Sequence, residues 1–392
     1  MKSVLQRFSG QQQTNEGPLR VVPVEGRRGL RQFIRLPWSI YRDDPAWVPP
    51  LLLERKEHLS KRNPFFEHAK CKFWLAYRGA TPVGRISAQV DQLHLQRYED
   101  STGFFGLLEA EDEAETFRAL MDTAETWLRD QGMRRVLGPF NLSINQECGL
   151  LVEGFDIPPM MMMGHARPYY GTRVEENGYR KEQDLLAYCV DVDFELTKAM
   201  RTVIKRAGRR VRIRSLRREH FSEELEILQD IFEDAWSQNW GFVPFTKAEF
   251  KHLGQNLKHL VHTEYIQIAE VDGSPDAMII GVPNVNESIQ NLNGRLLPFG
   301  WLKLLWRLKV NRPQTARVPL MGVRKRHHNS FLGAALALMV VERVRRLGVK
   351  YGAKKLELSW ILEDNAGMRK ILESIGGVVY KRYRIYGKGL VS

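Results

Sequence analysis

The residues most able to do chemistry lie between positions 316 and 336. An apolar stretch at 316–323 leads into the basic turn RKRHHNS at 324–330 and then into FLGAAL at 331–336. A strand that passes through such a turn into a helix brings free backbone N–H groups, the helix dipole and cations to one point. This segment therefore predicts an anion site.

The candidate anion ligands belong to the turn and to the first residues of the helix that follows. They are Arg324, Arg326, His328, Ser330, Gly333 and Ala334. The cations attract a phosphate group, and the small residues at the helix start let it approach closely. A second interpretation stays open, in which Gly333 and the alanines only allow the helix to pack tightly on a sheet.

The elements that follow complete a recognisable order. The pattern predicts a strand at 354–360, a helix at 366–374 and a last strand at 378–386. With LGAAL opening the long helix and EDNAGMRKILESIGG after the next strand, this order resembles the C-terminal half of a Gcn5-related N-acetyltransferase (GNAT) domain. The resemblance implies that the turn binds the pyrophosphate of acyl-coenzyme A (acyl-CoA), and that Asn365 lies beside its pantetheine arm.

The phosphate signature of that family is matched only in part. Its pattern, Gln/Arg-x-x-Gly-x-Gly/Ala, falls here on His328, Phe331 and Gly333, so only the last position agrees. Phosphate binding would then depend on the arginine, lysine and histidine side chains of the turn.

Length and composition limit the class of protein. A chain of 392 residues exceeds one ordinary domain of about 150 residues, and its 43% of hydrophobic residues can form real cores. It shows no cleavable leader and no long apolar run, which predicts a protein that is neither secreted nor membrane-spanning. Residues 1–17 are polar and are expected to be a disordered leader. The odd number of scattered cysteines predicts reduced thiols in the cytoplasm and no metal site; they are Cys71, Cys148 and Cys189.

The formal charge of +13 indicates an anionic partner. Nucleic acid, a membrane surface and coenzyme phosphates all carry such charge. A basic run at 205–218, KRAGRRVRIRSLRR, contains no aromatic residue, although nucleic-acid binding usually interleaves the two. The composition therefore makes nucleic acid an unlikely partner and leaves an anionic surface or coenzyme.

The predicted elements repeat one plan twice. We expect an α/β fold, a mixed central sheet flanked by helices, built as two tandem GNAT-like domains at 18–198 and 199–392. Strands are predicted at 20–24, 72–77, 83–90, 135–138, 184–192, 211–216, 266–271 and 277–282, and helices at 28–41, 115–131, 169–177 and 222–236. At the place of the phosphate turn the first domain carries EAEDEAE at 109–115, which would repel a pyrophosphate. We therefore expect the acyl-CoA site in the second domain alone.

A dense segment at 138–170 is predicted to form one wall of an acceptor site. It combines polar residues with an apolar loop, and loops of this length inside a domain are usually functional. Its candidates are Asn145 and His165 for substrate binding, Glu147 as a general base and Tyr170. Burial would raise the pKa of Glu147 toward neutrality, although a capping or ion-pair role is the alternative. The four methionines at 160–163 form either a pliable pocket surface or a buried strand.

The insertion at 294–312, GRLLPFGWLKLLWRLKVNR, predicts contact with a membrane. On a helix from Phe299, two cations share one side and apolar residues cover most of the rest. A short, basic, tryptophan-bearing helix is typical of a membrane interface, and an ordinary core helix is the alternative. The proposed contact residues are Trp301, Lys303, Trp306 and Arg307.

Longer motifs sharpen the resemblance. NPFFEHA, GPFNLSINQECGLLVEGF and LLPFGWLKLLW resemble the tandem group that includes bacterial ceramide synthases. That resemblance implies acyl-CoA-dependent N-acylation of a small or lipid amine, such as a sphingoid base, by a cytoplasmic protein peripheral to an anionic membrane. An aminoacyl-tRNA-dependent transferase and a non-catalytic membrane adaptor are the alternatives.

The resemblance also implies site residues. The family's general-acid tyrosine would fall near Leu372, which leaves Tyr170 and Tyr383 as candidates for that role. The family's acceptor-binding region corresponds to AWSQNWGFVPF, although packing of its aromatic rings between the domains is an alternative. Its residues are Trp236, Asn239, Trp240 and Phe242.

Overall fold

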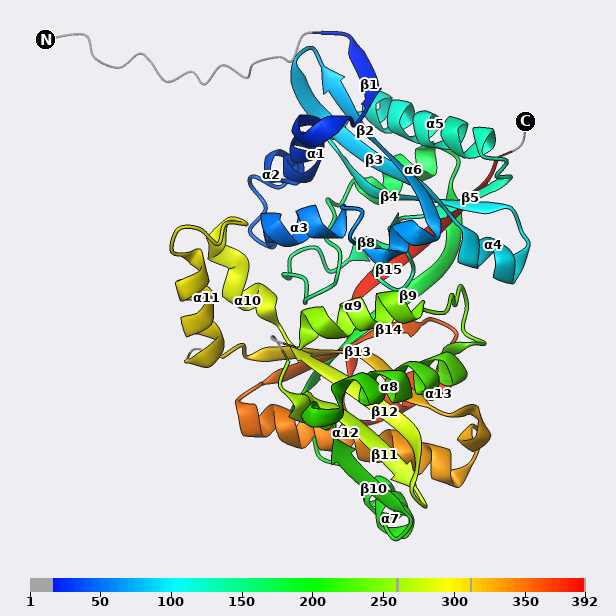
Figure 1. Ribbon diagram of the computed structural model, residues 1–392, viewed down its shortest axis with the longest axis vertical. Helices are drawn as coiled ribbons and strands as arrows, with labels where there is room; N and C mark the ends of the chain where they lie inside the picture. Colours follow the sequence, from blue (N-terminus) through cyan, green and yellow to red (C-terminus); the bar gives the residue numbers. More distant parts are fainter. Residues whose placement is uncertain (1–16, 259–260, 311, 391–392) are drawn as a thin grey trace, which may run out of the picture.

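One mixed sheet runs through both halves of the chain and carries helices on its faces (Figure 1). The computed structural model describes residues 17–258, 261–310 and 312–390. Within these residues the sheet has 13 strands, in the order β1-β2-β3-β4-β5-β15-β9-β14-β13-β12-β11-β10, with β8 beside β15. The predicted disordered leader lies, apart from Gly17, outside the described residues.

The first half supplies nine strands and six helices of the described residues. The strands are β1 (Leu19–Pro23), β2 (Ala69–Arg78), β3 (Thr81–Asp91), β4 (Thr102–Ala110), β5 (Arg135–Gly138), β6 (Phe140–Asn141), β7 (Glu147–Cys148), β8 (Leu150–Glu153) and β9 (Arg180–Asp191). The α-helices are α1 (Gly26–Arg35), α2 (Pro37–Ile40), α3 (Leu52–His58), α4 (Gln92–Tyr98), α5 (Ala114–Asp130) and α6 (Tyr170–Glu176).

The second half repeats the plan. Its strands are β10 (Val211–Ser215), β11 (Ile266–Val271), β12 (Ser274–Pro283), β13 (Thr315–Val323), β14 (Lys355–Leu362) and β15 (Val378–Gly389). Its α-helices are α7 (Lys198–Ala207), α8 (Phe221–Trp236), α9 (Lys247–Leu257), α10 (Val285–Ile289), α11 (Gly300–Lys309), α12 (Phe331–Tyr351) and α13 (Ala366–Ser374).

Three local features differ from the sequence pattern or decide between its alternatives. The helix predicted at 28–41 is divided, because Pro37 cannot donate a backbone hydrogen bond and starts α2 as its first residue. Strand β4 went unpredicted because its two glycines weaken the strand pattern, yet Gly106 lies so close to Phe140 that a side chain would meet its carbonyl oxygen at 1.7 Å. The methionine run at 160–163 is irregular chain, not a strand.

The halves exchange their last strands. Strand β9, which ends the first half, pairs antiparallel with β14, and β15, which ends the second, pairs antiparallel with β5. Strands β9 and β15 then pair with each other at the centre of the sheet. The end of the polypeptide is therefore part of the core of the first half, and both halves contribute to the region between them.

The parallel pair β13 and β14 opens partway along its length. The two strands are paired from Thr315 opposite Lys355 to Val318 opposite Leu358 and no further. Beyond that point β14 pairs only with β9, through Ile361 and Leu362, while β13 continues toward the start of α12. The strands thus diverge and leave a gap between their C-terminal ends.

Helices cover both faces of the second half's sheet. Alternate residues of β12 point to opposite sides: Met278 and Ile280 pack in the cluster under α8 and α9, and Ala277 and Ile279 pack under α12. Figure 1 shows α8 and α9 in front of the strands and α12 behind them.

An ion-pair cluster joins α9 to the first half. His68 Nδ1 lies 2.9 Å from Asp91 Oδ1, at the end of β3, and its Nε2 lies 3.2 Å from Glu249 Oε1, in the first turn of α9. Burial disfavours the charged imidazolium, but the two carboxylates outweigh this effect and raise the pKa of His68 to about 9.

This shift predicts a pH-dependent stability. Because the folded-state pKa lies above the unfolded value of about 6.5, the cluster's contribution is complete below pH 6.5 and is lost as the pH rises to about 9. Because solvent screens the charges of this partly buried imidazole, the contribution is expected to be about 1–2 kcal/mol. Urea unfolding of the wild type and of His68→Gln, from pH 6 to pH 10, measures it. A difference that stays constant over this range contradicts the prediction.

Candidate active site

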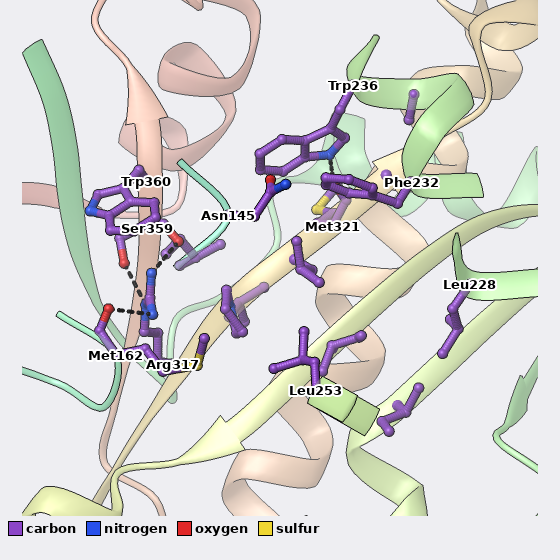
Figure 2. A pocket seen from close by; sticks show the side chains of 18 of the residues that line it. Asn145, Met162, Leu228, Phe232, Trp236, Leu253, Arg317, Met321, Ser359 and Trp360 are labelled. Carbon is purple, nitrogen blue, oxygen red and sulfur yellow. Dashed lines mark hydrogen bonds between the residues drawn. The ribbon is translucent and has the colours of Figure 1, made fainter. Parts of the chain in front are cut away.

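A cavity of about 730 Å³ lies where the two halves meet. Its walls come from α8 and α9, from β13 and from the diverging end of β14, and a fourth wall is the 144–148 segment of the first half (Figure 2). Most of its lining is apolar. Polar groups line it near the point where β13 and β14 separate, and Arg218, Lys258, His262 and Thr263 add polar groups next to the ends of α8 and α9. A cavity of this size and character is a typical ligand-binding site.

Most residues predicted to bind an acceptor line this cavity. Trp236 donates its indole N–H to the carbonyl oxygen of Met321 at 2.8 Å, and the Asn145 side chain donates to the carbonyl oxygen of Val243 at 2.8 Å. The structure thus brings together two segments that the sequence analysis assigned separately. The lining residues among the predicted set are Asn145, Trp236, Asn239, Trp240 and Phe242.

His165 lies elsewhere, contrary to expectation. Its Nε2 is 2.9 Å from Asp44 Oδ2, it does not line the cavity, and burial lowers its pKa. The polar partner Asp44 lies over a hundred positions away in the sequence, so no local pattern indicated this pairing.

The two arginines expected at the phosphates are paired with acids. Arg324 forms ion pairs with Asp230 and Asp276, and Arg326 with Asp276. His327 Nε2 also lies 2.8 Å from Asp276, which is buried. These side chains hold the turn in place around one carboxylate. Among the described residues Lys325 forms no ion pair.

The start of α12 keeps the form of an anion site. Ser330 caps the helix by accepting a hydrogen bond from the Gly333 N–H at 3.1 Å, while the N–H groups of Phe331 and Leu332 have no partner among the described residues. A side chain at Gly333 would meet the His327 carbonyl oxygen at 2.0 Å, so this position requires glycine for the close approach of the preceding turn. Ala334 is exposed beside it.

Two further predicted residues connect this helix start to the cavity. His328 is exposed, lies 2.7 Å through Nε2 from the Val323 carbonyl oxygen, and lines the cavity. Asn365 caps α13 by accepting from the Met368 N–H at 3.1 Å and also lines the cavity. The anion site and the gap between β13 and β14 therefore open into one space.

A buried polar network that the sequence candidates did not include lies at the bottom of this space. Arg317 is 1% exposed and donates to the Ser359 hydroxyl at 2.8 Å and to the Met161 carbonyl oxygen at 3.0 Å. Its Nε is 3.3 Å from Glu357 Oε1, and its guanidinium lies over the Trp360 ring. Figure 2 shows Arg317 between Ser359 and the methionine loop of the first half. An arginine within an otherwise apolar strand, ARVPLMGV, was the available signal.

Ser359 and Glu357 form the reactive part of this network. The Ser359 hydroxyl lines the cavity and donates to Glu357 Oε1 at 2.5 Å, while Tyr380 donates its hydroxyl to the other carboxylate oxygen. A serine oxygen that accepts from Arg317 and donates to a carboxylate retains one lone pair. Ser359 and Glu357 together can therefore accept a proton from a group in the cavity.

The expectation of a raised pKa at Glu147 is wrong. Burial favours its neutral form, but the Arg55 guanidinium 3.3 Å away and the hydrogen bond from Asn141 at 3.1 Å outweigh burial, and the pKa lies below its usual value. Gln146 and Cys148 line the cavity on either side of it, and Glu147 does not. The ion-pair alternative describes this side chain.

Glu147→Gln is accordingly expected to leave the rate of any reaction in the cavity within about twofold of the wild type. Its free energy of unfolding should fall by about 1–3 kcal/mol, because Arg55 loses its buried partner. Activity assays and urea unfolding of the same preparation separate the two effects. A hundredfold loss of rate in a folded variant would restore Glu147 as the base.

The two candidate acids also lie outside the cavity lining. Tyr170 donates to Glu109 at 2.8 Å within the first half, and burial followed by the Glu109 charge raises its pKa well above the usual value. Tyr383 is fully buried in β15, its hydroxyl has no partner among the described residues, and burial raises its pKa. Neither tyrosine is placed to act on a molecule in the cavity.

Helix α11 presents apolar side chains to solvent. Trp306 is 57% exposed, and Trp301, Leu302 and Leu305 are exposed beside it, while Leu304 and Leu308 pack on the cluster around α10. Lys303 is exposed, whereas Arg307 donates to the Ser288 carbonyl oxygen at 2.7 Å. Leu305, Leu308 and Lys309 also line the cavity. Because its outer side is uncovered, α11 is not an ordinary core helix.

Two absences hold for the described residues. No helix among them combines the length and apolar character needed to cross a bilayer. No group of three or more His, Cys, Asp or Glu side chains among them is placed to hold a metal ion.

Comparison with solved structures identifies the fold. A tandem GNAT protein from the clavulanic acid biosynthesis pathway matches with a TM-score of 0.56 at 13% identity, over 96% of this chain and 99% of that one. A GCN5-related N-acetyltransferase from Sphaerobacter thermophilus matches with a TM-score of 0.52 at 12% identity, over 95% and 96% of the two chains. These similarities confirm the predicted tandem GNAT architecture.

Comparison with sequences identifies closer relatives. No family model matches the chain. Protein YghO of Escherichia coli (strain K12) is 48% identical over 363 residues, which cover 92% of this chain and 93% of that protein. The bacterial ceramide synthase of Caulobacter vibrioides (strain NA1000 / CB15N) is 45% identical over 375 residues, 95% of this chain and 98% of that protein. The chain therefore belongs to the family of tandem GNAT proteins that includes this bacterial ceramide synthase.

Proposed function

We propose that the protein is an acyl-CoA-dependent N-acyltransferase whose acceptor is a lipid amine, such as a sphingoid base. The observation that carries this proposal is the large apolar cavity that opens at one end onto a helix start suited to phosphate. An amphiphile fits its apolar walls, and the polar network at β14 supplies proton transfer. The family relationship with a ceramide synthase supports the same acceptor class.

The coenzyme belongs to the second half in this proposal. Its phosphates lie at the start of α12, against the N–H groups of Phe331 and Leu332, with the Lys325 ammonium and the His328 imidazole beside them. Its pantetheine arm enters the gap between β13 and β14 beside Asn365. At the matching place in the first half, Glu111 and Asp112 follow β4, and a phosphate there would be repelled.

The network at the bottom of the cavity provides the base. As the amine nitrogen forms a bond to the thioester carbonyl carbon, its proton passes to the Ser359 hydroxyl, which gives its own proton to Glu357. The carbon–sulfur bond then breaks, and the leaving sulfur of the coenzyme takes up the proton that Glu357 received. Because the amine attacks the thioester directly, no covalent enzyme intermediate forms. Arg317 fixes the positions of the Ser359 and Glu357 side chains for this transfer.

The protein acts at the cytoplasmic face of an anionic membrane in this proposal. The exposed rings of Trp301 and Trp306 suit the headgroup depth, and Lys303 and Lys309 lie nearby to pair with anionic lipids. Because α11 also lines the cavity, a lipid amine can enter the cavity next to the membrane surface.

The double variant Trp301→Glu/Trp306→Glu is expected to lose binding to vesicles of phosphatidylcholine and phosphatidylglycerol by tenfold or more. Its melting temperature should stay close to that of the wild type, because both side chains are exposed. Vesicle sedimentation and circular dichroism measure the two properties. The matched control Val349→Glu/Val378→Glu makes the same charge change at exposed valines of α12 and β15 and should bind normally. Equal losses in both variants would assign the effect to charge alone.

The test of function is acyl transfer by the purified protein. With palmitoyl-CoA and sphinganine, mass spectrometry should detect the N-acyl product, and free coenzyme thiol should appear in equal amount. A lysine peptide in place of sphinganine should react far more slowly. Coenzyme binding without product from any amine would favour a non-catalytic adaptor, and activity only with charged tRNA would favour the aminoacyl transferase.

A further inference from the structure

The part of the cavity beneath α8 and α9 is a hollow in what would otherwise be a hydrophobic core. Its walls are buried or partly buried apolar side chains of the second half, and Figure 2 shows several of them facing the open space. They include Leu225, Leu228, Phe232, Phe250, Leu253 and Ile280. We call this part the α8–α9 chamber.

Such a hollow needs an occupant. Protein interiors are packed as closely as organic crystals, and voids larger than a water molecule are few. A large void lined by apolar groups lowers stability because its walls lose their contacts, and water gains no hydrogen-bond partners there. The walls named above are apolar and suit a hydrocarbon, and the polar lining residues closest in sequence are Arg218, just before α8, and Lys258, His262 and Thr263, just after α9.

The chamber is continuous with the strand that leads to the helix start of α12. Leu320 of β13 packs with the chamber residues, and Met321, Gly322 and Val323 of the same strand line the cavity up to the basic turn. The wall formed by α11, by contrast, lies at the opposite side of the second half, next to the exposed tryptophans. A chain that follows β13 from the phosphate site thus reaches the chamber first.

We infer that the α8–α9 chamber, with Leu253 as one of its walls, binds the aliphatic chain of a long-chain acyl-CoA. This inference rests on the proposed function, since it assigns one of the two substrates to a defined part of the cavity. The amine's hydrocarbon chain then lies toward α11 and the first half.

Calorimetric binding of acetyl-CoA, octanoyl-CoA and palmitoyl-CoA tests the chamber directly, without turnover. In the wild type, affinity should rise with chain length by up to about fourfold for each methylene buried. In Leu253→Trp the indole fills part of the chamber, so affinity for palmitoyl-CoA should fall at least tenfold while affinity for acetyl-CoA stays unchanged. Val349→Trp makes a similar increase in size on an exposed face of α12 and should behave as the wild type.

Each outcome decides the inference. Circular dichroism verifies folding, and Leu253→Phe, a smaller plug, takes the place of Leu253→Trp if that variant unfolds. If palmitoyl-CoA binds Leu253→Trp and the control Val349→Trp with equal affinity, the inference is overturned. It is also overturned if Leu253→Trp loses sphinganine binding and keeps acyl-CoA binding. If acetyl-CoA binds and acyl transfer occurs while affinity is independent of chain length, only the chamber assignment fails. If no acyl-CoA binds the wild type, the proposed function fails as well.

Discussion

Ser359→Ala is expected to lower the turnover number for acyl transfer by about a hundredfold. The variant removes the hydroxyl that lines the cavity and donates to Glu357 at 2.5 Å, and alanine leaves no group to relay the proton. Binding of acyl-CoA should change little, because the proposed phosphate contacts lie at α12. Turnover and calorimetric affinity, measured on the same preparation, separate the chemical step from binding.

A pH profile distinguishes proton transfer from a structural role. At higher pH hydroxide can take the proton from the attacking amine, so the deficit of Ser359→Ala should shrink, whereas a misplaced cavity wall would reduce the rate at every pH. Ser374→Ala, which removes an exposed hydroxyl on α13, is the matched control and should retain full activity. Full turnover in Ser359→Ala would remove the serine from the mechanism.

Arg317→Met is expected to lower the free energy of unfolding by about 3–5 kcal/mol. The guanidinium is 1% exposed and the Glu357 carboxylate is fully buried, so the variant leaves an uncompensated charge inside the protein. It also removes the bond to Met161 that fixes the first half's loop against β13. Urea denaturation with a fluorescence readout measures the loss.

The double variant Arg317→Met/Glu357→Gln provides the internal test. Because it removes both charges, it should be more stable than Arg317→Met alone, which a sum of two independent losses would not predict. Arg346→Met, at an exposed ion pair on α12, should have little effect. A double variant that is less stable than both Arg317→Met and Glu357→Gln would contradict an electrostatic origin of the lost stability.

Local patterns were sufficient for much of the second half. The apolar run of β13, the basic turn and the small residues opening α12 were identified because a strand, a turn and a helix start each depend on neighbouring residues. The same holds for α11, whose two tryptophans and cations within ten residues indicated an exposed helix. The tandem plan was also visible, since each half repeats its order of elements.

The charge state of Glu147 depended on the tertiary structure. Its sequence surroundings are apolar and predicted a raised pKa, but folding brings Arg55 to within 3.3 Å of its carboxylate. Arg324 and Arg326 were likewise identified as cations, while their partner Asp276 comes from β12. An ionisable group responds to whichever charge is nearest in space, and sequence distance does not limit that choice.

The sequence by itself determined which elements form and which of them carry cations, small residues and exposed aromatic rings. The tertiary structure alone decided the exchange of β9 and β15, the gap between β13 and β14, and the meeting of Arg317, Glu357 and Ser359 with the methionine loop. The physical reason is that helices and turns are stabilised by contacts within a few residues. Strand pairing, cavities and buried ion pairs depend on contacts between segments that can lie more than two hundred positions apart.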